Sequence, residues 1–142
     1  MRIVLILLIL VVIFLVAILI IFPYSSGEMP TVQSANGLSE RAVVTTDDGE
    51  LAVMLISENI DNPVLIVCGG GPGIPQYLLE DMYPSRLAEN FTVCYWDYRG
   101  TGLNYRENID PSDMTTERYI ADTGFVTDYL TERFQQKPTH RI

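Results

Sequence analysis

The sequence predicts an α/β domain in which an antiparallel hairpin is followed by parallel strands with crossover helices. Two β-rich runs flank the turn Asp47-Asp48-Gly49, an apolar run from Val64 ends in glycines, a second apolar run begins at Thr92, and a long amphipathic pattern follows Thr115. A strand, a helix and a strand in succession form a right-handed crossover, so the two apolar runs are expected to pair in parallel.

A transmembrane helix is expected in front of this domain. Ile3 to Phe22 contains 20 residues with no charge, no polar side chain, no Gly and no Pro. A helix of that length spans ~30 Å, the thickness of the hydrocarbon core of a bilayer. A cleaved secretory signal is the alternative, but its apolar core is roughly 7 to 15 residues long and ends in small residues. This run ends in Ile21-Phe22-Pro23-Tyr24, which favours an uncleaved anchor over residues 1–22.

The flanking charges predict how the chain is oriented. Arg2 and the terminal amine precede the apolar run, and the first charge after it is Glu28. The positive-inside rule then places the N-terminus in the cytoplasm and the domain outside it, as a single-pass membrane protein. Residues 23–37 are rich in Pro, Ser, Gly and Asn, which is typical of a flexible linker, and residues 38–142 form the expected domain.

Charge and cysteine content exclude several classes of partner. The chain has 18 acidic against 9 basic residues and a formal net charge of −9. Such a surface repels phosphate backbones, so no nucleic-acid partner is expected. Cys68 and Cys94 lie inside apolar runs and are expected to be small buried residues, with a disulfide in an oxidising compartment as the alternative. No histidine or acidic ligand accompanies them, so no metal site is expected.

The hairpin and the first strand after it follow from local patterns. Arg41 to Thr46 and Glu50 to Ser57 are predicted strands, and the Asp-Gly pair between them is expected to supply the positive φ angles of a tight turn. Val64 to Cys68 is a short apolar run that stops at glycines, which predicts a buried strand.

The second half of the domain contains helices and another strand. Tyr77 to Asn90 has helical spacing in two pieces, because Pro84 must begin a helix rather than lie inside one. Thr92 to Tyr98 is the next predicted strand. Thr116 to Phe134 is predicted to be a helix capped by Thr115. Its apolar face is expected to contain Tyr119, Thr123, Val126, Leu130 and Phe134.

Phosphate binding, the common use of a glycine-rich turn after a strand, does not fit this chain. The Walker pattern needs a Lys after its second Gly, and the only Lys is Lys137. The third glycine of a dinucleotide motif would fall at Ile74 or at Gln76. No nucleotide or other cofactor is therefore expected.

Acyl-transfer chemistry fits the glycines of Gly69 to Gly73 better. A tetrahedral oxyanion needs two rigid N–H donors, and one commonly comes from the loop after a central strand. Glycines leave the backbone accessible and Pro72 fixes φ, and a cis peptide before it would aim the Gly71 amide into a cleft. A tight turn with no ligand is the alternative.

Two motifs together carry a family resemblance. GGGPG at Gly69 to Gly73 and WDYRGTGLNY at Trp96 to Tyr105 both follow predicted strands. The pair resembles α/β-hydrolases of the proline iminopeptidase type, which carry His-Gly-Gly-Pro-Gly and Asp-Gln-Arg-Gly-x-Gly-x-Ser in these places. Met114 to Phe134 resembles the family helix that leads into the nucleophile strand. The resemblance covers roughly residues 40–134 and implies the N-terminal part of an α/β-hydrolase sheet.

The resemblance also implies site residues. Gly71 is the expected oxyanion donor, and Asp97 and Arg99 are expected to hold neighbouring loops by charge-assisted hydrogen bonds rather than to act in catalysis. The full set that matches the two motifs is Gly70, Gly71, Pro72, Gly73, Asp97, Arg99, Gly100 and Gly102. The departures are Gly69 for His, Tyr98 for Gln and Asn104 for Ser, and the loss of the ring at position 69 is expected to leave the loop more mobile.

The catalytic residues of the family are absent. No Gly-x-Ser-x-Gly elbow occurs, and His140, the only histidine, lies in a polar tail where it is not expected to act as a base. The sequence therefore predicts a truncated membrane-anchored serine hydrolase that is inactive as given, acting on a small peptide or ester only when completed. The alternative is a membrane-tethered binding module that uses an exposed sheet edge.

Overall fold

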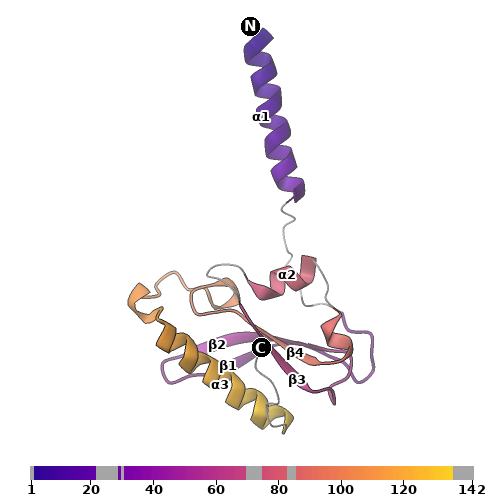
Figure 1. Ribbon diagram of the computed structural model, residues 1–142, viewed down its shortest axis with the longest axis vertical. Coiled ribbons are helices and arrows are strands. Elements are labelled where there is room, and N and C mark those ends of the chain that lie inside the picture. Colours follow the sequence, from indigo (N-terminus) through magenta and orange to yellow (C-terminus); the bar gives the residue numbers. More distant parts are fainter. Residues whose placement is uncertain (1, 22–28, 30, 70–74, 83–85, 136–142) are drawn as a thin grey trace.

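The computed structural model describes residues 2–21, 29, 31–69, 75–82 and 86–135 (Figure 1). The helices and strands, in chain order, are α1 (Arg2–Ile21), β1 (Leu38–Thr45), β2 (Glu50–Ser57), β3 (Val64–Cys68), α2 (Gln76–Met82), β4 (Thr92–Trp96) and α3 (Thr116–Phe134). Three short 3₁₀ turns complete the described regular structure: η1 (Leu87–Glu89), η2 (Gly102–Asn104) and η3 (Pro111–Asp113).

The strands form one mixed four-stranded sheet in the order β1-β2-β4-β3. β2 pairs antiparallel with both β1 and β4, whereas β3 and β4 are parallel, with Val64 opposite Thr92 and Cys68 opposite Trp96. The predicted hairpin and parallel pair are both confirmed. Because these two strands are parallel, the segments that follow Cys68 and Trp96 lie at the same end of the sheet.

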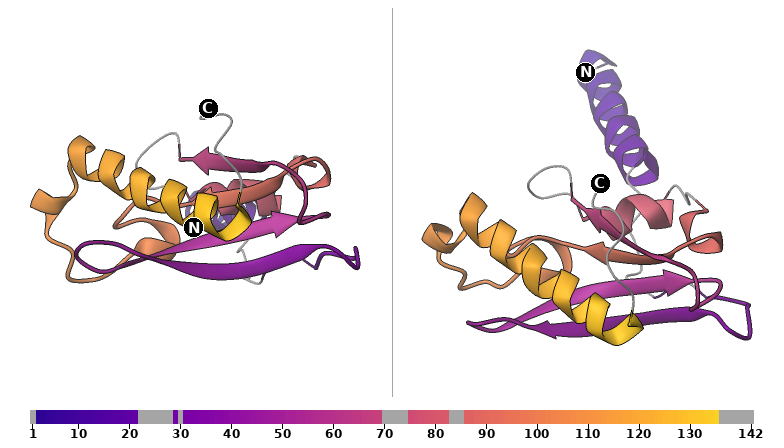
Figure 2. Two further views of the ribbon diagram at one scale, coloured as in Figure 1. Left: turned by 90° about the horizontal axis from the view of Figure 1, so that it is seen from below. Right: turned by 60° about the horizontal axis from the view of Figure 1, so that its bottom comes forward.

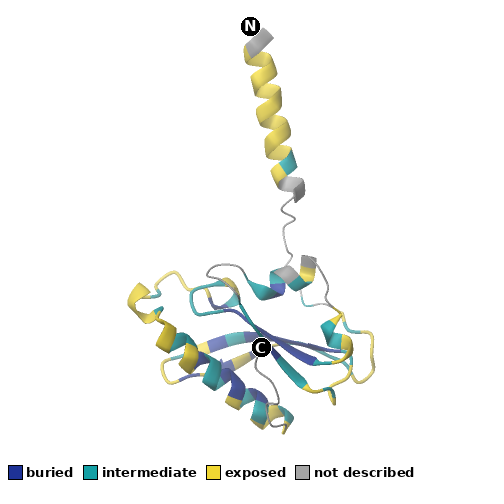
Figure 3. Ribbon diagram, in the orientation of Figure 1, coloured by how far each residue is buried: buried dark blue, intermediate teal, exposed yellow. Residues whose placement is uncertain are grey.

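Alternating side chains divide the core into two layers. Val53 and Leu55 of β2 point to the face covered by α3, where Val126 and Leu130 pack, whereas Met54 and Ile56 point to the face covered by Tyr77 of α2. Figures 1 and 2 show α3 lying across one face of the sheet and α2 on the other. Every residue of β4 is buried, so the strand that leads to the second glycine motif lies at the centre of the core (Figure 3).

The hairpin turn differs from its prediction. The ladder ends at Thr45 opposite Glu50, and the Thr46 N–H donates to the Gly49 carbonyl at 2.8 Å, so four residues form the loop. Among the described residues, positive φ angles occur at Arg86, Gly100, Gly102 and Gln135, not in this turn. The Asp-Gly pair therefore does not act as a positive-φ turn here, because a four-residue loop closes the hairpin without one.

The remaining elements lie close to where the sequence predicts them. The expected helix in two pieces is α2 followed by η1, and Pro84 between them lies outside the described residues. β4 ends at Trp96, two residues earlier than predicted. This earlier end matters because Asp97 and Tyr98 then belong to the loop that follows the strand rather than to the sheet.

Helix α3 begins and ends as predicted. The Thr115 hydroxyl accepts a hydrogen bond from the Arg118 N–H at 3.2 Å, which caps the helix. The buried face of α3 differs from the expected one. Asp122 and Thr127 are buried beside Val126 and Leu130, whereas the other expected residues, Tyr119, Thr123 and Phe134, are partly buried.

The glycine within α3 provides a test of this helix assignment. A Cβ at Gly124 would meet no atom within 4 Å, so alanine fits there without steric cost. Gly124→Ala is expected to stabilise the domain by about 1 kcal/mol, because Gly loses more backbone entropy in a helix than Ala. Thermal unfolding followed by circular dichroism measures the shift, and a lower unfolding temperature would contradict it.

The N-terminal helix forms where the anchor is expected. α1 runs from Arg2 to Ile21, and its described side chains from Val4 to Val16 are exposed (Figure 3). Within the described ranges, however, no helix has both the length and the apolar character required to cross a bilayer. Membrane insertion of Ile3 to Phe22 stays a prediction.

Part of the expected linker contacts the domain. Met29 and Val32 pack against the core layer that contains Met54 and Tyr77. Nearby, the side-chain amide of Asn36 donates to the Asn59 side chain at 2.6 Å, and its backbone carbonyl accepts from the Ile60 N–H at 2.9 Å. Ordered contacts therefore begin before residue 38.

Candidate functional site

The glycine loop that follows β3 and the loop that follows β4 leave the same edge of the sheet. Gly69 ends the described part of the first loop, which resumes at Pro75 and Gln76. Gly70, Gly71, Pro72 and Gly73, the expected oxyanion-loop residues, lie outside the described residues together with the Gly71-Pro72 peptide. The described part of the site consists of the residues that flank the loop and hold its two ends.

Asp97 holds the far end of the glycine loop. Its side chain is buried, with one carboxylate oxygen accepting from the Gln76 N–H at 3.0 Å and the other from the Leu103 N–H at 3.1 Å. Both donors are backbone amides, so the carboxylate ties the start of α2 to the η2 turn. Each oxygen of the buried Asp97 carboxylate accepts one of these backbone hydrogen bonds. Asp97 therefore has a structural role.

Tyr98 holds the near end of the same loop. Its hydroxyl donates to the carbonyl oxygen of Gly69, and its ring stacks on Tyr119 of α3 with centroids 4.9 Å apart. Burial raises the pKa of the Tyr98 hydroxyl, helped by Cys68 and Tyr119, so the group keeps its proton at neutral pH and remains a donor. Tyr98 and Asp97, which are adjacent in the loop after β4, thus contact Gly69 and Gln76 respectively.

Asn104 fixes the β4 loop to the sheet. Its side-chain amide donates to the Asp97 carbonyl at 2.7 Å and to the Ala52 carbonyl at 3.0 Å, while its side-chain oxygen accepts from the Ala52 N–H at 2.7 Å. The residue is buried, and these contacts join η2 to β2. Asn104 was identified in the sequence only as a departure from the family pattern, because its partners lie on a strand distant in sequence.

The two glycines of the second motif have different surroundings. Gly102 has φ +46°, and a Cβ there would lie 2.1 Å from the Asp97 carboxylate oxygen. Gly100 has φ +80°, and its nearest neighbour would be the flexible Met114 side chain at 3.0 Å. Only Gly102 is therefore required both by backbone conformation and by the close approach of Asp97.

Arg99 joins three separate segments. Its guanidinium donates to both oxygens of Asp122 on α3, at 2.9 and 3.0 Å, and to both oxygens of Asp48 in the hairpin loop, at 3.1 and 3.2 Å. The Arg99 side chain is 11% exposed and that of Asp122 is 0% exposed. The hydrogen bonds that Arg99 donates to Asp122 raise the pKa of Arg99, and the Asp48 carboxylate adds to the same effect. The arrangement locks the hairpin loop and α3 around the start of the β4 loop.

Arg118 extends this ion-pair network. Its guanidinium contacts the carboxylates of Asp47 and Asp48, and its Nε lies 3.4 Å from Asp122. Hydrogen bonding to Asp47 raises the pKa of Arg118. Burial disfavours ionisation of Asp48, but the Thr46 hydroxyl and the Arg99 and Arg118 charges together lower its pKa below the ordinary value of 3.8.

The lowered pKa of Asp48 predicts a dependence of stability on pH. The folded-state pKa lies below the unfolded one, so Asp48 stabilises the fold above about pH 4 and loses this contribution as pH falls through the folded pKa. The free energy of unfolding is expected to fall less steeply below about pH 4 in Asp48→Asn than in the wild type. Urea titrations at a series of pH values measure both slopes, and equal slopes would contradict the assignment.

The cysteines do not form a disulfide. Cys94 is buried in β4 and Cys68 is partly buried in β3, and both are in the thiol form. Burial raises the pKa of the Cys94 thiol far above its usual range, so it is an unreactive core residue. Among the described residues, no group of three or more His, Cys, Asp or Glu side chains is placed to hold a metal ion.

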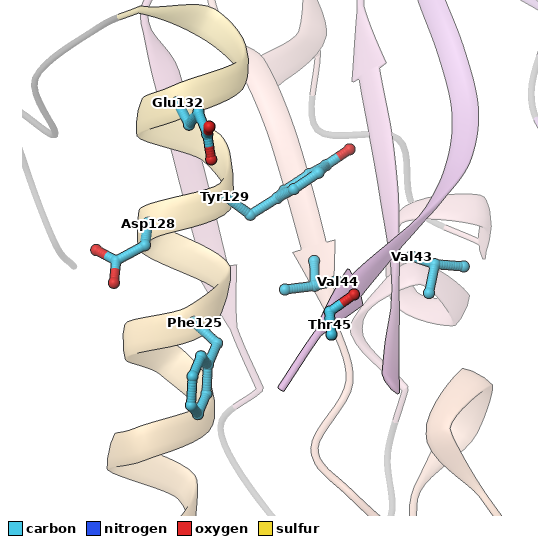
Figure 4. A pocket seen from close by; sticks show the side chains of 7 residues that line it. All are labelled: Val43, Val44, Thr45, Phe125, Asp128, Tyr129 and Glu132. Carbon is cyan, nitrogen blue, oxygen red and sulfur yellow. The ribbon is translucent and has the colours of Figure 1, made fainter. Parts of the chain in front are cut away.

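A groove of about 400 Å³ lies away from the glycine loops, between β1 and α3 (Figure 4). Figure 4 shows Phe125 and Tyr129 of α3 facing Val44 and Thr45 of β1. The complete lining is Val43, Val44, Thr45, Phe125, Asp128, Tyr129 and Glu132. None of these residues belongs to either glycine motif, so the groove is separate from the expected oxyanion site.

Comparison with known proteins gives a consistent relationship. The chain is 39% identical over 90 residues to the probable aminopeptidase YbaC of Bacillus subtilis (strain 168), a match that covers 62% of this chain and 28% of that protein. The crystal structure of the proline iminopeptidase-related protein TTHA1809 from Thermus thermophilus matches with a TM-score of 0.54 and 31% identity, over 69% of this chain and 33% of that one. The chain is a partial relative of the proline iminopeptidase-type α/β-hydrolases.

The relationship to proline iminopeptidase-type α/β-hydrolases extends over a limited part of those proteins. The chain spans about a third or less of the length of these relatives. No protein-family model matches it. The mixed sheet, with its antiparallel hairpin and parallel β3-β4 pair, fits part of such a hydrolase.

Proposed function

We propose that these residues form the oxyanion-loop part of a serine hydrolase that releases an N-terminal residue, such as proline, from small peptides or cleaves related amides and esters. The observation that carries the proposal is the anchoring of the glycine loop. Asp97 contacts one end at Gln76 and Tyr98 contacts the other end at Gly69. The names of the two relatives, an aminopeptidase and a proline iminopeptidase-related protein, support this class of substrate.

The proposed role of the loop is electrostatic. Attack on an amide or ester carbonyl places negative charge on its oxygen, and a fixed backbone N–H stabilises that charge in the transition state. Gly71 is the proposed donor. A rigid frame around the loop is useful for this purpose because the donor must be aimed before the charge develops.

The nucleophile and its base are proposed to come from outside these 142 residues. The sequence contains no Gly-x-Ser-x-Gly elbow, and His140 is its only histidine. The purified 142-residue chain is therefore expected to hydrolyse neither proline arylamides nor p-nitrophenyl esters above the protein-free rate. Turnover that scales with protein concentration and survives repeated purification would contradict the proposal.

Membrane attachment is a second part of the proposal. Ile3 to Phe22 contains no polar side chain, and α1 presents exposed apolar side chains from Val4 to Val16. Asn90-Phe91-Thr92 is a glycosylation acceptor sequence, so it can report the orientation. Translation with microsomes is expected to give a glycosylated, carbonate-resistant product, and Asn90→Gln is the control that removes the glycan. A carbonate-extractable product would contradict attachment, and an unglycosylated membrane-bound product would contradict the orientation.

A non-catalytic binding module is a second candidate function. The groove between β1 and α3 favours it, because it combines an edge strand with the aromatic rings of Phe125 and Tyr129. A binding module must fold by itself. Slow amide exchange throughout residues 38–134 of the full chain would support this function, whereas rapid exchange throughout that region would exclude it.

A further inference from the structure

We propose that Tyr98 is a positioning residue for the glycine loop, filling the space beside Gly69 and holding its carbonyl group. Asp97 and Tyr98 then act as a pair, one for each end of the loop. The relevance of this pair to catalysis rests on the proposed function. The contact itself is a property of the fold and can be tested separately.

The ring of Tyr98 is held firmly enough to position another group. It stacks on Tyr119 with an interplanar angle of 20°, and it meets Trp96 edge-on with centroids 5.1 Å apart and an angle of 85°. Trp96 is fully buried in β4 and Tyr119 belongs to α3. Because these neighbours belong to the buried strand β4 and to helix α3, packed secondary structure directs the Tyr98 hydroxyl at Gly69.

Positions 69 and 98 share one volume. A Cβ at Gly69 would lie 3.6 Å from the Tyr98 ring and 3.5 Å from the Gln76 side chain, which is ordinary van der Waals contact. A methyl group therefore fits, but a larger side chain at position 69 would displace the Tyr98 ring. The motifs that this chain resembles have His and Gln at these two positions, whereas this chain has Gly and Tyr. In this chain the larger side chain therefore stands at position 98, and its ring fills the space beside Gly69.

The hydrogen bond adds direction to this packing. A peptide unit is planar, so a held Gly69 carbonyl fixes the plane of the peptide through which the chain enters the loop. Asp97 fixes the other end through the Gln76 N–H. The two contacts hold the described residues on either side of the loop, Gly69 and Gln76.

The first test uses the carbonyl resonance of Gly69 in the isotopically labelled full chain, kept in detergent micelles. Tyr98→Phe keeps the ring and removes the hydroxyl, so the Gly69 carbonyl ¹³C signal is expected to move upfield, the direction for a lost hydrogen bond. Tyr105→Phe is the matched control, because Tyr105 is 68% exposed. A Gly69 signal that stays in place in Tyr98→Phe would overturn the proposal.

The second test is a double-mutant cycle measured by thermal unfolding of the same full chain. Gly69→His alone is expected to lower the unfolding temperature by several degrees, and Gly69→His combined with Tyr98→Gln is expected to recover at least half of that loss. If the double variant loses as much stability as the two single variants together, positions 69 and 98 do not share one volume and the proposal is overturned. Neither readout uses hydrolysis, so failure of the proposed function and failure of this inference give different results.

Discussion

Replacing Arg99 with Met is expected to lower the free energy of unfolding by about 3–5 kcal/mol, the usual cost of removing one partner from a buried ion pair. Asp122 is fully buried and receives two hydrogen bonds from Arg99. Met preserves most of the side-chain volume but, among the contacts of the described residues, leaves this carboxylate only the longer one to Arg118 at 3.4 Å. Urea unfolding of the two proteins at neutral pH measures the difference.

Arg133→Met is the matched control for this variant. Arg133 pairs with Glu40 on the surface, where both side chains are about a third exposed. Exposed ion pairs contribute at most about 1 kcal/mol, so the loss is expected to be much smaller than for Arg99→Met. Equal losses for the two variants would mean that the buried network does not hold α3 and the hairpin loop together.

Gly102→Ala is expected to destabilise the fold by about 3 kcal/mol, from a strained φ angle and a steric clash together. The residue has φ +46°, and the new Cβ would lie 2.1 Å from Asp97 Oδ2. Asp97 must then move away from the Leu103 N–H, which it now contacts at 3.1 Å. The unfolding free energy and the Leu103 amide exchange rate are both expected to report the change.

Gly124→Ala serves as the control for Gly102→Ala, because the chemical change is the same and the surroundings are open. The two variants are expected to shift stability in opposite directions. A stabilising Gly102→Ala would show that the β4 loop tolerates a side chain beside Asp97. That result would contradict the close packing of the β4 loop around the Asp97 carboxylate.

The sequence was sufficient to predict the main elements of the domain. Thr115 and the apolar spacing that ends at Phe134 define α3, and the β-rich run Glu50–Ser57 forms a strand with two buried faces. The parallel pairing of β3 with β4 follows from the helical segment between them. These features depend on interactions close in sequence or on general rules of chain topology.

The contacts of the site could be predicted only in part. A role for Asp97 and Arg99 in holding loops followed from the family resemblance, but their partners did not. Asp122 resembles any surface carboxylate in sequence, and it is buried only because Arg99 and Arg118 reach it in the fold. Long-range partners of polar side chains carry no periodic signal, so they become visible only with the tertiary structure.

The hairpin loop and Tyr98 illustrate two further limits. Asp-Gly favours a two-residue turn, but the register of β1 and β2 leaves four residues to close the hairpin. The absence of a ring at Gly69 suggests a loosely held loop, yet the Tyr98 hydroxyl from the loop after β4 donates to the Gly69 carbonyl. In both cases the pairing of distant segments overrides the local preference.

The most direct measurement of the central claim uses a chimera of the Bacillus subtilis relative, in which this chain supplies the 90-residue segment that the two proteins share. The rate of aminoacyl arylamide hydrolysis, with proline among the substrates, is compared between the chimera and the same chimera carrying Gly71→Pro. The chimera is expected to be active, and Gly71→Pro is expected to lower kcat about 10²- to 10³-fold, because it removes the N–H proposed to stabilise the oxyanion. A folded chimera without activity, or one equally active with Gly71→Pro, would contradict the assignment of this chain to the oxyanion-loop part of a hydrolase.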